Sequence, residues 1–175
     1  MKKTITILAM MISILSFSQE AKFKFTQDGL TDYVITECKD KSAGELYKKT
    51  IDWINVNYTN PNEVIKAKVE NEMIRIDGFG KSAFSRTFSD GTKADYDVTY
   101  TMEFQFQDGK YRIKYTHKGI TVDNSEVFFK ITDVINNIQD KNGNGWNNAK
   151  EQYQGFVQLQ IDSLFNYITK KNNGW

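Results

Sequence analysis

Residues Asp95 to His117, with the sequence DYDVTYTMEFQFQDGKYRIKYTH, decide the fold. Large apolar side chains alternate with polar ones on both sides of Asp108-Gly109, a dipeptide preferred in two-residue type I′ hairpin turns. Alternation with a period of two is typical of a β-strand that buries one face. The stretch therefore predicts a long antiparallel hairpin with one apolar face and one polar face.

The two-residue turn also predicts the register of this hairpin, because it leaves one way to pair the flanking residues. Phe104 is then opposite Ile113 on the apolar face, and Glu103 is opposite Lys114 on the polar face. A slip of one residue would turn the whole apolar set to the other face. The turn, the apolar face and the charge pairing thus indicate the same register.

A strand and a helix are predicted before the hairpin. Tyr33 to Thr36 is rich in β-branched and aromatic residues, which favour strands. Ser42 and Glu45 have the spacing of a capping box, in which each side chain accepts a hydrogen bond from the backbone N–H of the other residue. A wide apolar stripe from Leu46 to Tyr58 indicates the helix that follows, and Pro61 is predicted to end it.

Three shorter stretches with strand periodicity lie between the helix and the hairpin. They are Ile65 to Val69, Ile74 to Asp77, and Ala83 to Phe88. Gly78-Phe79-Gly80 predicts a bulge or a bend between the second stretch and the third. Together with the hairpin, these segments predict a run of antiparallel strands.

The last third of the chain, from about residue 125 to residue 171, is predicted to be helical. Helix-spaced apolar residues are weak before Asn142, whereas Tyr153 to Ile168 predicts a long amphipathic helix. A helix, a run of antiparallel strands and a second helix indicate an α+β domain. We expect a β-meander sheet with the N-terminal helix and the long C-terminal helix packed on one face.

Residues 1–18 have the pattern of a secretory signal peptide. A basic pair precedes an uncharged apolar run, and Ser16 and Ser18 supply small residues for cleavage before Gln19. The run is shorter than the about 20 apolar residues that a membrane-spanning helix needs, which disfavours the alternative of an uncleaved N-terminal anchor. We therefore expect export to the periplasm or the extracellular space, and a single domain over residues 19–175 without a membrane span.

Charge and cysteine content exclude several classes of protein. The chain has 23 Lys and Arg against 22 Asp and Glu, and cleavage after Ser18 would remove two lysines. Phosphate recognition needs a basic surface, so nucleic acid is not an expected partner. The single cysteine, Cys38, cannot form an intramolecular disulfide, so a disulfide-stapled fold is excluded.

A set of short motifs spread over about residues 28–118 resembles a known bacterial domain. The motifs are Asp28-Gly29-Leu30, Ser42 with Glu45-Leu46-Tyr47, Trp53-Ile54, Glu63-Val64-Ile65, Ile76 with Gly78 and Gly80, and Asp108-Gly109-Lys110-Tyr111-Arg112. The domain that they resemble is a bacterial exported domain of unknown function, assigned a TATA-binding-protein-like (TBP-like) fold. The resemblance implies a β-α-β-meander-α topology. It implies no activity, because the family has no established catalytic or binding residues.

Residues 140–151 have the spacing of an EF-hand calcium loop. In such a loop the side-chain oxygens would come from Asp140, Asn142, Asn144 and Glu151, and a backbone carbonyl from Trp146. Two features argue against calcium. Position eight is Asn147, where an apolar residue normally docks the loop, and only two of the side-chain ligands are charged. We expect no metal or other cofactor, with a calcium-binding module as the alternative.

The remaining reactive side chains are expected to be structural. His117 is the only histidine and lies on the predicted apolar face, which favours a hydrogen-bonded structural role over catalysis. Cys38 is expected to be a buried, inert thiol. Solvated strand faces explain two carboxylate pairs better than acid–base catalysis does: Asp95 with Asp97, and Glu70 with Glu72.

No constellation of catalytic residues stands out in the sequence. We therefore expect a non-catalytic exported domain that binds another envelope component or a small ligand, through the sheet or a helix edge. The calcium-binding module is the second hypothesis. An unrecognised hydrolase is the third, because scattered Asp, Glu and Tyr residues can build such a site without leaving a motif.

Overall fold

The structure is a computed structural model that describes residues 22–26, 29–30, 33–122, 125–126, 130–139, 143 and 145–170. The predicted signal peptide, residues 1–18, lies outside the described residues. Three of the residues considered as calcium ligands, Asp140, Asn142 and Asn144, also lie outside them.

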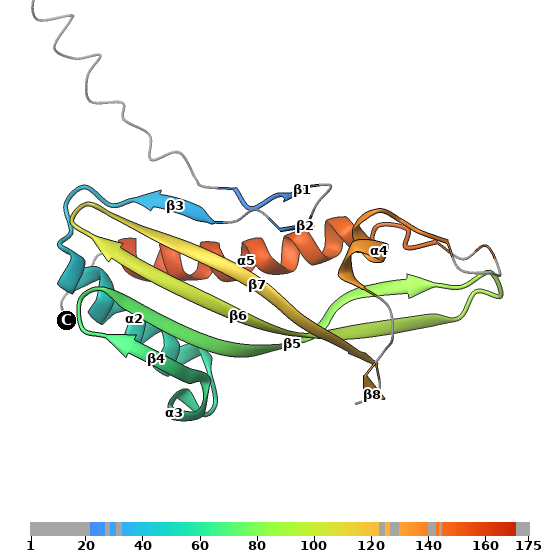
Figure 1. Cartoon of the computed structure of the whole chain (residues 1–175), viewed down its shortest axis with the longest axis horizontal. Helices are drawn as coiled ribbons and strands as arrows, with labels where there is room; N and C mark the ends of the chain where they lie inside the picture. The colour runs from blue at the N-terminus through green and yellow to red at the C-terminus, as the bar shows by residue number, and fades with distance from the viewer. Residues whose placement is uncertain are drawn as a thin grey trace, which may run out of the picture.

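An antiparallel sheet of six strands forms the centre of the molecule (Figure 1). Its strands are β3 (Val34–Glu37), β4 (Ile65–Val69), β5 (Met73–Thr87), β6 (Lys93–Gln107), β7 (Lys110–Val122) and β8 (Ser125–Glu126). The order is β3-β7-β6-β5-β4, and β8 pairs with β7. The consecutive strands β4 to β7 are the predicted meander, whereas β3 pairs with the last strand of that meander. A separate two-stranded sheet joins β1 (Phe25–Thr26) and β2 (Gly29–Leu30).

The hairpin of β6 and β7 has the predicted register. Phe104 pairs with Ile113, and Glu103 pairs with Lys114. Gly109 takes φ 78°, the left-handed backbone conformation that the turn requires and that glycine adopts without strain. The side chains of Phe104 and Ile113 are buried on the covered face, as their alternation predicts.

The predicted bulge in β5 lies a few residues after the predicted place. Gly78-Phe79-Gly80 pairs regularly with β6, and the register shifts between Gly80 and Phe84. Ser82 in this interval has φ 50°, and its backbone N–H donates to Asp97 Oδ1 at 2.7 Å. The strand therefore continues through the bulge, so the two predicted segments form one strand of 15 residues.

The two glycines of β5 provide space for aromatic rings. A Cβ at Gly78 would collide with the ring of Tyr100 on β6, and a Cβ at Gly80 would collide with the ring of Phe156. Phe156 belongs to the long C-terminal helix, so the helix packs directly against the strand backbone here. Neither contact could be predicted from the glycines alone.

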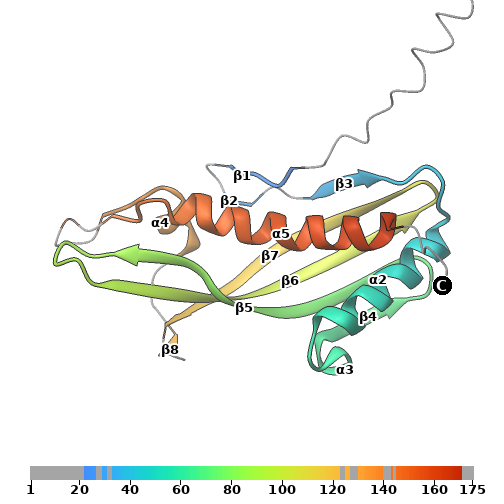
Figure 2. The ribbon, with the colours of Figure 1, turned by 180° about the vertical axis from the view of Figure 1, so that it is seen from behind.

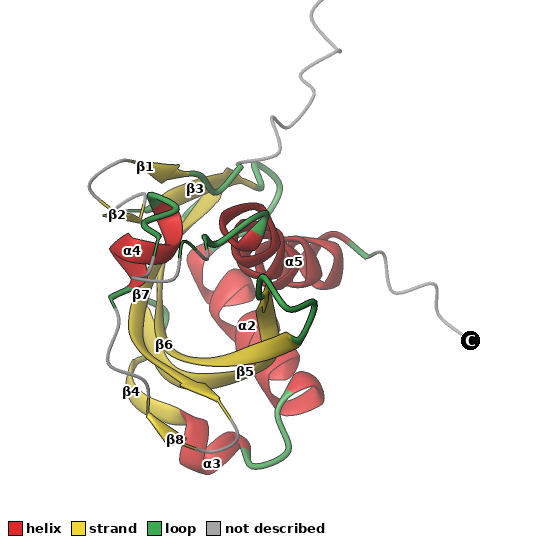
Figure 3. Cartoon of the chain, turned by 90° about the vertical axis from the view of Figure 1, so that its right-hand side faces the viewer, coloured by secondary structure: helices red, strands yellow, loops and turns green. Residues whose placement is uncertain are grey.

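Two long helices cover the same face of the sheet, as predicted (Figures 2 and 3). They are α2 (Ala43–Asn57) and α5 (Ala149–Thr169). Both hydrogen bonds of the predicted capping box at Ser42 and Glu45 are present. The predicted role of Pro61 needs a correction, because α2 already ends at Asn57 and Pro61 begins a short helix, α3 (Pro61–Val64). Proline suits a first helical turn, where its missing N–H would have no partner.

The prediction of a helical region from residue 125 was wrong for its first part. Ser125–Glu126 is strand β8, and among the described residues between 125 and 149 the one helix is α4 (Ile131–Ile135), of five residues. Asn137 and Asn148 have positive φ values of 51° and 61°, which a continuous helix does not allow. The apolar residues of this region still enter the core, since Val134, Ile135 and Trp146 are buried.

The core between the sheet and the helices also takes in residues from the N-terminus. Phe23 is 2 % exposed and Phe25 is 7 % exposed. The rest of the core follows the predicted faces, including all the spaced apolar residues of α5 from Tyr153 to Ile168. The N-terminal contribution was not predicted.

Candidate functional site

The face of the sheet opposite α2 and α5 contains a groove of about 700 Å³. The groove lies at the hairpin end of the sheet, and residues of all five principal strands or their turns line it. The lining residues are Ile35, Val69, Glu72, Met73, Arg75, Glu103, Gln105, Phe106, Gln107, Lys110, Tyr111 and Arg112. We refer to this site as the sheet groove.

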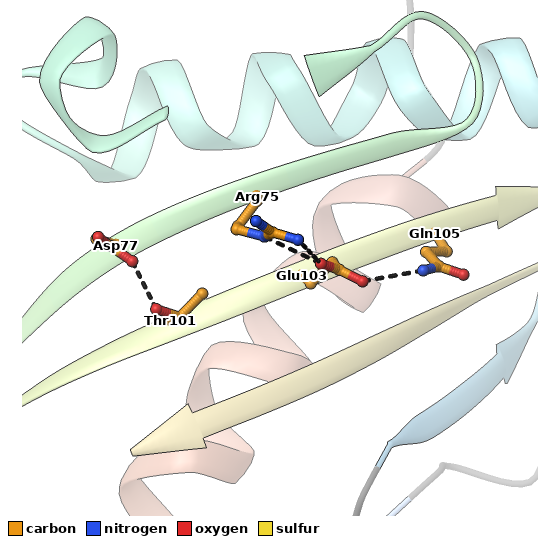
Figure 4. Close-up of polar contacts among 5 residues, drawn as sticks. All are labelled: Arg75, Asp77, Thr101, Glu103 and Gln105. Atoms are coloured by element: carbon orange, nitrogen blue, oxygen red, sulfur yellow. Dashed lines mark hydrogen bonds and ion pairs between the residues drawn. The ribbon is translucent and has the colours of Figure 1, made fainter. Parts of the chain in front are cut away.

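A chain of three polar side chains forms the centre of the sheet groove (Figure 4). Arg75 on β5 donates two hydrogen bonds to Glu103 Oε2 on β6, from Nε at 3.0 Å and from Nη2 at 2.7 Å. The other carboxylate oxygen, Oε1, accepts from Gln105 Nε2 at 2.9 Å. The Arg75 guanidinium therefore holds the pKa of the Glu103 carboxyl below its usual range, and the Gln105 amide adds to this effect.

The edge of the sheet groove on the β3 side combines a cation with apolar side chains. The Arg112 guanidinium lies over the ring of Tyr33, 5.4 Å from its centroid. Tyr33 and Ile35 on the edge strand are 44 % and 46 % exposed, although both are large apolar residues. On the opposite edge, Val69 is also 46 % exposed. The arrangement places exposed apolar side chains at both edges of a charged centre.

Sequence reasoning missed the Arg75–Glu103 pair. It predicted Lys114 as the partner of Glu103, and Lys114 does occupy the paired position on β7. The hydrogen bonds from Arg75 come from the other neighbouring strand, β5, whose register with β6 pairs Arg75 directly with Glu103. The turn between β5 and β6 is longer than two residues, so its chemistry alone does not predict that register.

His117 forms a hydrogen bond, as predicted. It pairs with Tyr100 in the sheet, and its Nδ1 is 2.8 Å from the hydroxyl of Tyr153 on α5. The Tyr153 hydroxyl also lies 3.0 Å from that of Tyr115, which extends the network into the core. Burial lowers the pKa of His117 to about 4, so the imidazole is neutral at pH 7.

Cys38 and His117 do not form a reactive pair. The Cys38 side chain is buried, and burial raises the pKa of its thiol. Its backbone N–H donates to the carbonyl oxygen of Gly109, at the turn that begins β7. His117 lies eight residues further along the chain in β7, so the two side chains are separated by more than about 20 Å at the usual rise per residue.

The carboxylate pairs are on solvated faces, as expected. Asp95 forms an ion pair with Lys93 at 3.4 Å, with both side chains more than half exposed. Asp97 accepts from the backbone of the β5 bulge. Glu70 and Glu72 are exposed in the turn between β4 and β5.

The described residues of the segment with calcium-loop spacing already have hydrogen-bond partners. The Gly145 carbonyl accepts from Arg86 Nε at 3.1 Å, and the guanidinium lies 4.4 Å from the ring of Trp146. The Trp146 carbonyl accepts from the Ala149 N–H at 2.8 Å. Glu151 lies in the first turn of α5, beside the N-terminal residues Lys22 to Lys24. A guanidinium at the Gly145 carbonyl opposes a second cation there, because like charges repel.

No group of three or more His, Cys, Asp or Glu side chains could hold a metal ion in the part of the chain that the structure describes. Among the described helices, none is long and apolar enough to cross a membrane.

Comparisons with known proteins agree with the resemblance seen in the sequence. Residues 33–119 match the model of a domain of unknown function, DUF4468, with TBP-like fold. No curated protein matches the chain. A crystal structure of a DUF4468 family protein from Bacteroides ovatus matches 83 % of this chain and 90 % of its own, with a TM-score of 0.57 and 10 % identity.

A second crystal structure, of a TBP-like protein from Parabacteroides distasonis, matches 79 % of this chain and 91 % of its own. Its TM-score is 0.56 and its sequence identity is 18 %. At these identities the likeness shows the fold alone, and it extends beyond the residues that match the family model. The predicted β-α-β-meander-α topology is thus confirmed, and the chain carries a domain of the DUF4468 family, a domain of unknown function with a TBP-like fold.

Proposed function

We propose that this protein is an exported, non-catalytic binding domain and that the sheet groove takes its ligand. The observation that carries the proposal is the ordered Arg75–Glu103–Gln105 chain at the centre of a groove with exposed apolar edges. Such an arrangement offers fixed hydrogen-bonding groups together with apolar contact, which is what specific binding sites require. Both long helices lie on the opposite face of the sheet (Figure 3).

The chemistry of the groove favours binding over proton transfer. Both oxygens of Glu103 accept hydrogen bonds, and Arg75 stabilises the charged form. A general acid or base needs a pKa near the working pH, whereas the pKa of Glu103 is lowered away from it. A carboxylate held in this way instead fixes the position of its neighbours. The groove therefore suits the binding of a ligand that undergoes no chemical change.

The charges at the β7 side of the groove indicate the chemistry of the ligand. Arg112 stacks on Tyr33, and no carboxylate of the described residues forms an ion pair with it. Lys110 lies beside it along the same strand and lines the same groove. A ligand with an anionic group next to an apolar portion would place that group at Arg112 and Lys110, and its apolar portion against Ile35.

A crosslinking experiment in cells tests the location of the site. A photoreactive amino acid replaces Gln105 in the groove in one strain, and Val56 in another. Val56 is 72 % exposed on α2, so it is a matched control on the helix side of the molecule. We expect one envelope component to be captured from position 105 and not from position 56. Capture of the same set of components from both positions would contradict the proposal.

A charge reversal then tests binding with the captured component in purified form. Arg112→Glu should weaken its binding at least tenfold, because the variant reverses the charge at the groove edge. Lys48→Glu on α2 makes the same change of charge on the helix side and should leave binding unchanged. Equal effects of the two variants would show that net charge, and not the groove, controls binding.

Export is tested separately. Mass spectrometry of the protein from its native cells should find a mature chain that begins at Gln19, or within a residue or two of it. An intact Met1 on a protein that remains in the cytoplasm would contradict export and leave the sheet groove to be tested on its own.

A further inference from the structure

The N-terminal residues Lys22-Phe23-Lys24-Phe25, here called the arm, lie against the body of the domain with an alternating pattern. Both phenylalanines are buried, whereas both lysines are exposed. The match to the family model begins at residue 33, so the arm precedes the family domain. The arm therefore contributes two aromatic rings to the core from outside the residues that match the family model.

The arm fills a cleft between β7 and α5 that has a mixed aromatic and polar floor. The Phe23 ring makes an edge contact with Tyr115 at a centroid distance of 5.9 Å, and the Phe25 ring lies 5.1 Å from that of Tyr153. The hydroxyls of these two tyrosines are hydrogen-bonded to one another, and that of Tyr153 to His117. Alternate residues of an extended chain point the same way. Phe23 and Phe25 are two residues apart, so both rings can lie side by side on this floor.

The rim of the cleft binds the backbone of the arm, and acidic residues line the groove that contains its lysines. Gln158 Oε1 on α5 accepts the backbone N–H of Phe23 at 2.7 Å. A groove of about 460 Å³ continues along the helix beside the arm, and its lining includes Lys22 and Lys24 together with Glu151 and Asp162. Opposite charges thus line the same groove. A Cβ at Gly155 in this groove would meet no atom within 4 Å, so the groove is open there.

The described backbone of the arm belongs to no strand ladder of the six-stranded sheet. Strand β1 pairs only with β2, in a two-stranded sheet separate from the six-stranded one. The arm can therefore leave without breaking the ladder of the main sheet. This step rests on the proposed export, because cleavage before Gln19 places the arm near the N-terminus, where segments held mainly by side chains open locally at a lower free energy than the core does.

We propose that the cleft between β7 and α5 is a binding site for an extended peptide with two aromatic residues separated by one, each preceded by a basic residue. The arm occupies this site as a displaceable ligand within the same chain. A peptide of the same pattern from another protein binds when the arm opens. Its two rings take the places of Phe23 and Phe25, and the backbone N–H of its first aromatic residue donates to Gln158. This site is distinct from the sheet groove, and the two proposals can fail independently.

The first experiment uses the unchanged full chain and measures amide hydrogen exchange. We expect the Phe23 amide to exchange at least tenfold faster than that of Ile113, and its rate to be insensitive to low denaturant, because it opens locally. Equal rates for the two amides, rising together with denaturant, would show that the arm leaves only when the domain unfolds. That result would overturn the proposal.

The second experiment measures binding of a synthetic peptide that spans residues 19–28. The receptor is the full chain with Phe23→Ala and Phe25→Ala, which keeps the arm but removes its rings. We expect the peptide to bind this variant at least tenfold more tightly than it binds the unchanged chain, where the arm competes at the high effective concentration of a linked segment. A peptide with both phenylalanines replaced by alanine is the control and should not bind.

A variant of the rim tests the location of the bound peptide. Gln158→Ala on the background of the double variant removes the acceptor of the Phe23 N–H and should weaken binding of the peptide at least tenfold. If the double variant does not fold, Phe25→Ala alone carries the same comparison. Failure of the peptide to bind a folded variant, or equal binding to the unchanged chain, would overturn the proposal.

Exchange of arms between two copies is the competing explanation. Sedimentation of the unchanged chain should show a monomer over a wide range of concentration. A dimer that forms at high concentration, and that the double variant does not form, would show that the arm of a second copy fills the cleft. The occupant of the cleft would then be a second copy of this protein and not a foreign peptide, and the proposal would be overturned.

Discussion

The two faces of the β6–β7 hairpin are built from alternate residues of the same two strands, but they differ in what holds them. On the covered face, Phe104 and Ile113 are at most 1 % exposed and pack under the helices. On the uncovered face, Glu103 and Arg75 form an ion pair whose side chains are 20 % and 48 % exposed. One face therefore carries the stability of the domain, and the other can change its residues at little cost in stability. Binding sites can vary on such a surface without endangering the fold.

The largest expected effect is the loss of a side chain from the covered face. Ile113→Ala should lower the free energy of unfolding by about 2–5 kcal/mol, because it removes buried methyl groups and leaves a cavity. Lys114→Ala, the next residue on the opposite face, should cost less than about 1 kcal/mol, as exposed ion-pairing residues do. Denaturant unfolding of both variants measures the difference. Equal costs would mean that the two faces are not separated in the way described.

The next largest effect comes from the polar network inside the covered face. Burial lowers the pKa of His117 to about 4, against 6.5 for a free imidazole. The unfolded chain therefore binds a proton more readily than the folded one, and stability is lost as the pH falls from about 6.5 to 4. Because His117 is partly exposed, we expect a loss of about 2 kcal/mol and not the full value of the shift.

The His117→Gln variant isolates this contribution. Its stability should change less than that of the unchanged chain between pH 7 and pH 4.5, because glutamine does not titrate. Denaturant unfolding at several pH values gives both curves. Parallel curves for the two proteins would show that His117 titrates in the folded state much as it does in water.

A smaller effect is expected on the uncovered face. Arg75→Ala should cost at most about 1 kcal/mol at pH 7, and less at high salt, because the pair is partly exposed and therefore screened. The same variant should raise the pKa of Glu103, since Arg75 is the main cause of its lowering. A carboxyl titration by NMR compares it with Gln105→Ala, which should shift that pKa less. An unchanged Glu103 pKa in Arg75→Ala would contradict the pairing.

Calcium is expected to have no effect on the melting temperature. This experiment tests residues 140–151, which lie outside both faces of the hairpin. Binding to the folded state alone would raise stability by about 2.7 kcal/mol at a calcium concentration of 100 Kd. We predict the same melting temperature in a few millimolar calcium and in chelator. A rise of several degrees that disappears in Glu151→Gln would overturn this prediction and assign a site to the loop that begins at Asp140.

The sequence predicted local structure well where several signals agreed. The hairpin at Asp108-Gly109 combines a two-residue turn with matched patterns on both sides, so its register followed from neighbouring residues. The capping box at Ser42 and Glu45 likewise depends on a spacing of three residues. The hairpin register and the capping box are both determined by residues close together in the sequence, so the segment itself contains the information that predicts them.

Features that depend on distant segments could not be predicted. The pairing of β3 with β7 joins residues about 80 positions apart, and nothing near Val34 indicates that partner. The centre of the candidate site depends on the register between β5 and β6, which a longer turn leaves open. The burial of Phe23 depends on α5, and the segment from residue 125 was misread because its apolar spacing does not exclude short elements linked by asparagine.

The glycines of β5 have a consequence for which substitutions the domain tolerates over generations. Gly78 and Gly80 lie directly under the rings of Tyr100 and Phe156, whereas Phe79 between them is 55 % exposed on the other face. In a library that samples every amino acid at these three positions, selection for the folded protein should keep glycine at the outer two and accept many residues at the middle one. The distance between helix α5 and the sheet thus depends on the missing side chain of Gly80, and the position of the Tyr100 ring on β6 depends on that of Gly78. A lineage that lost either glycine would have to move an aromatic ring on another segment to keep the core packed.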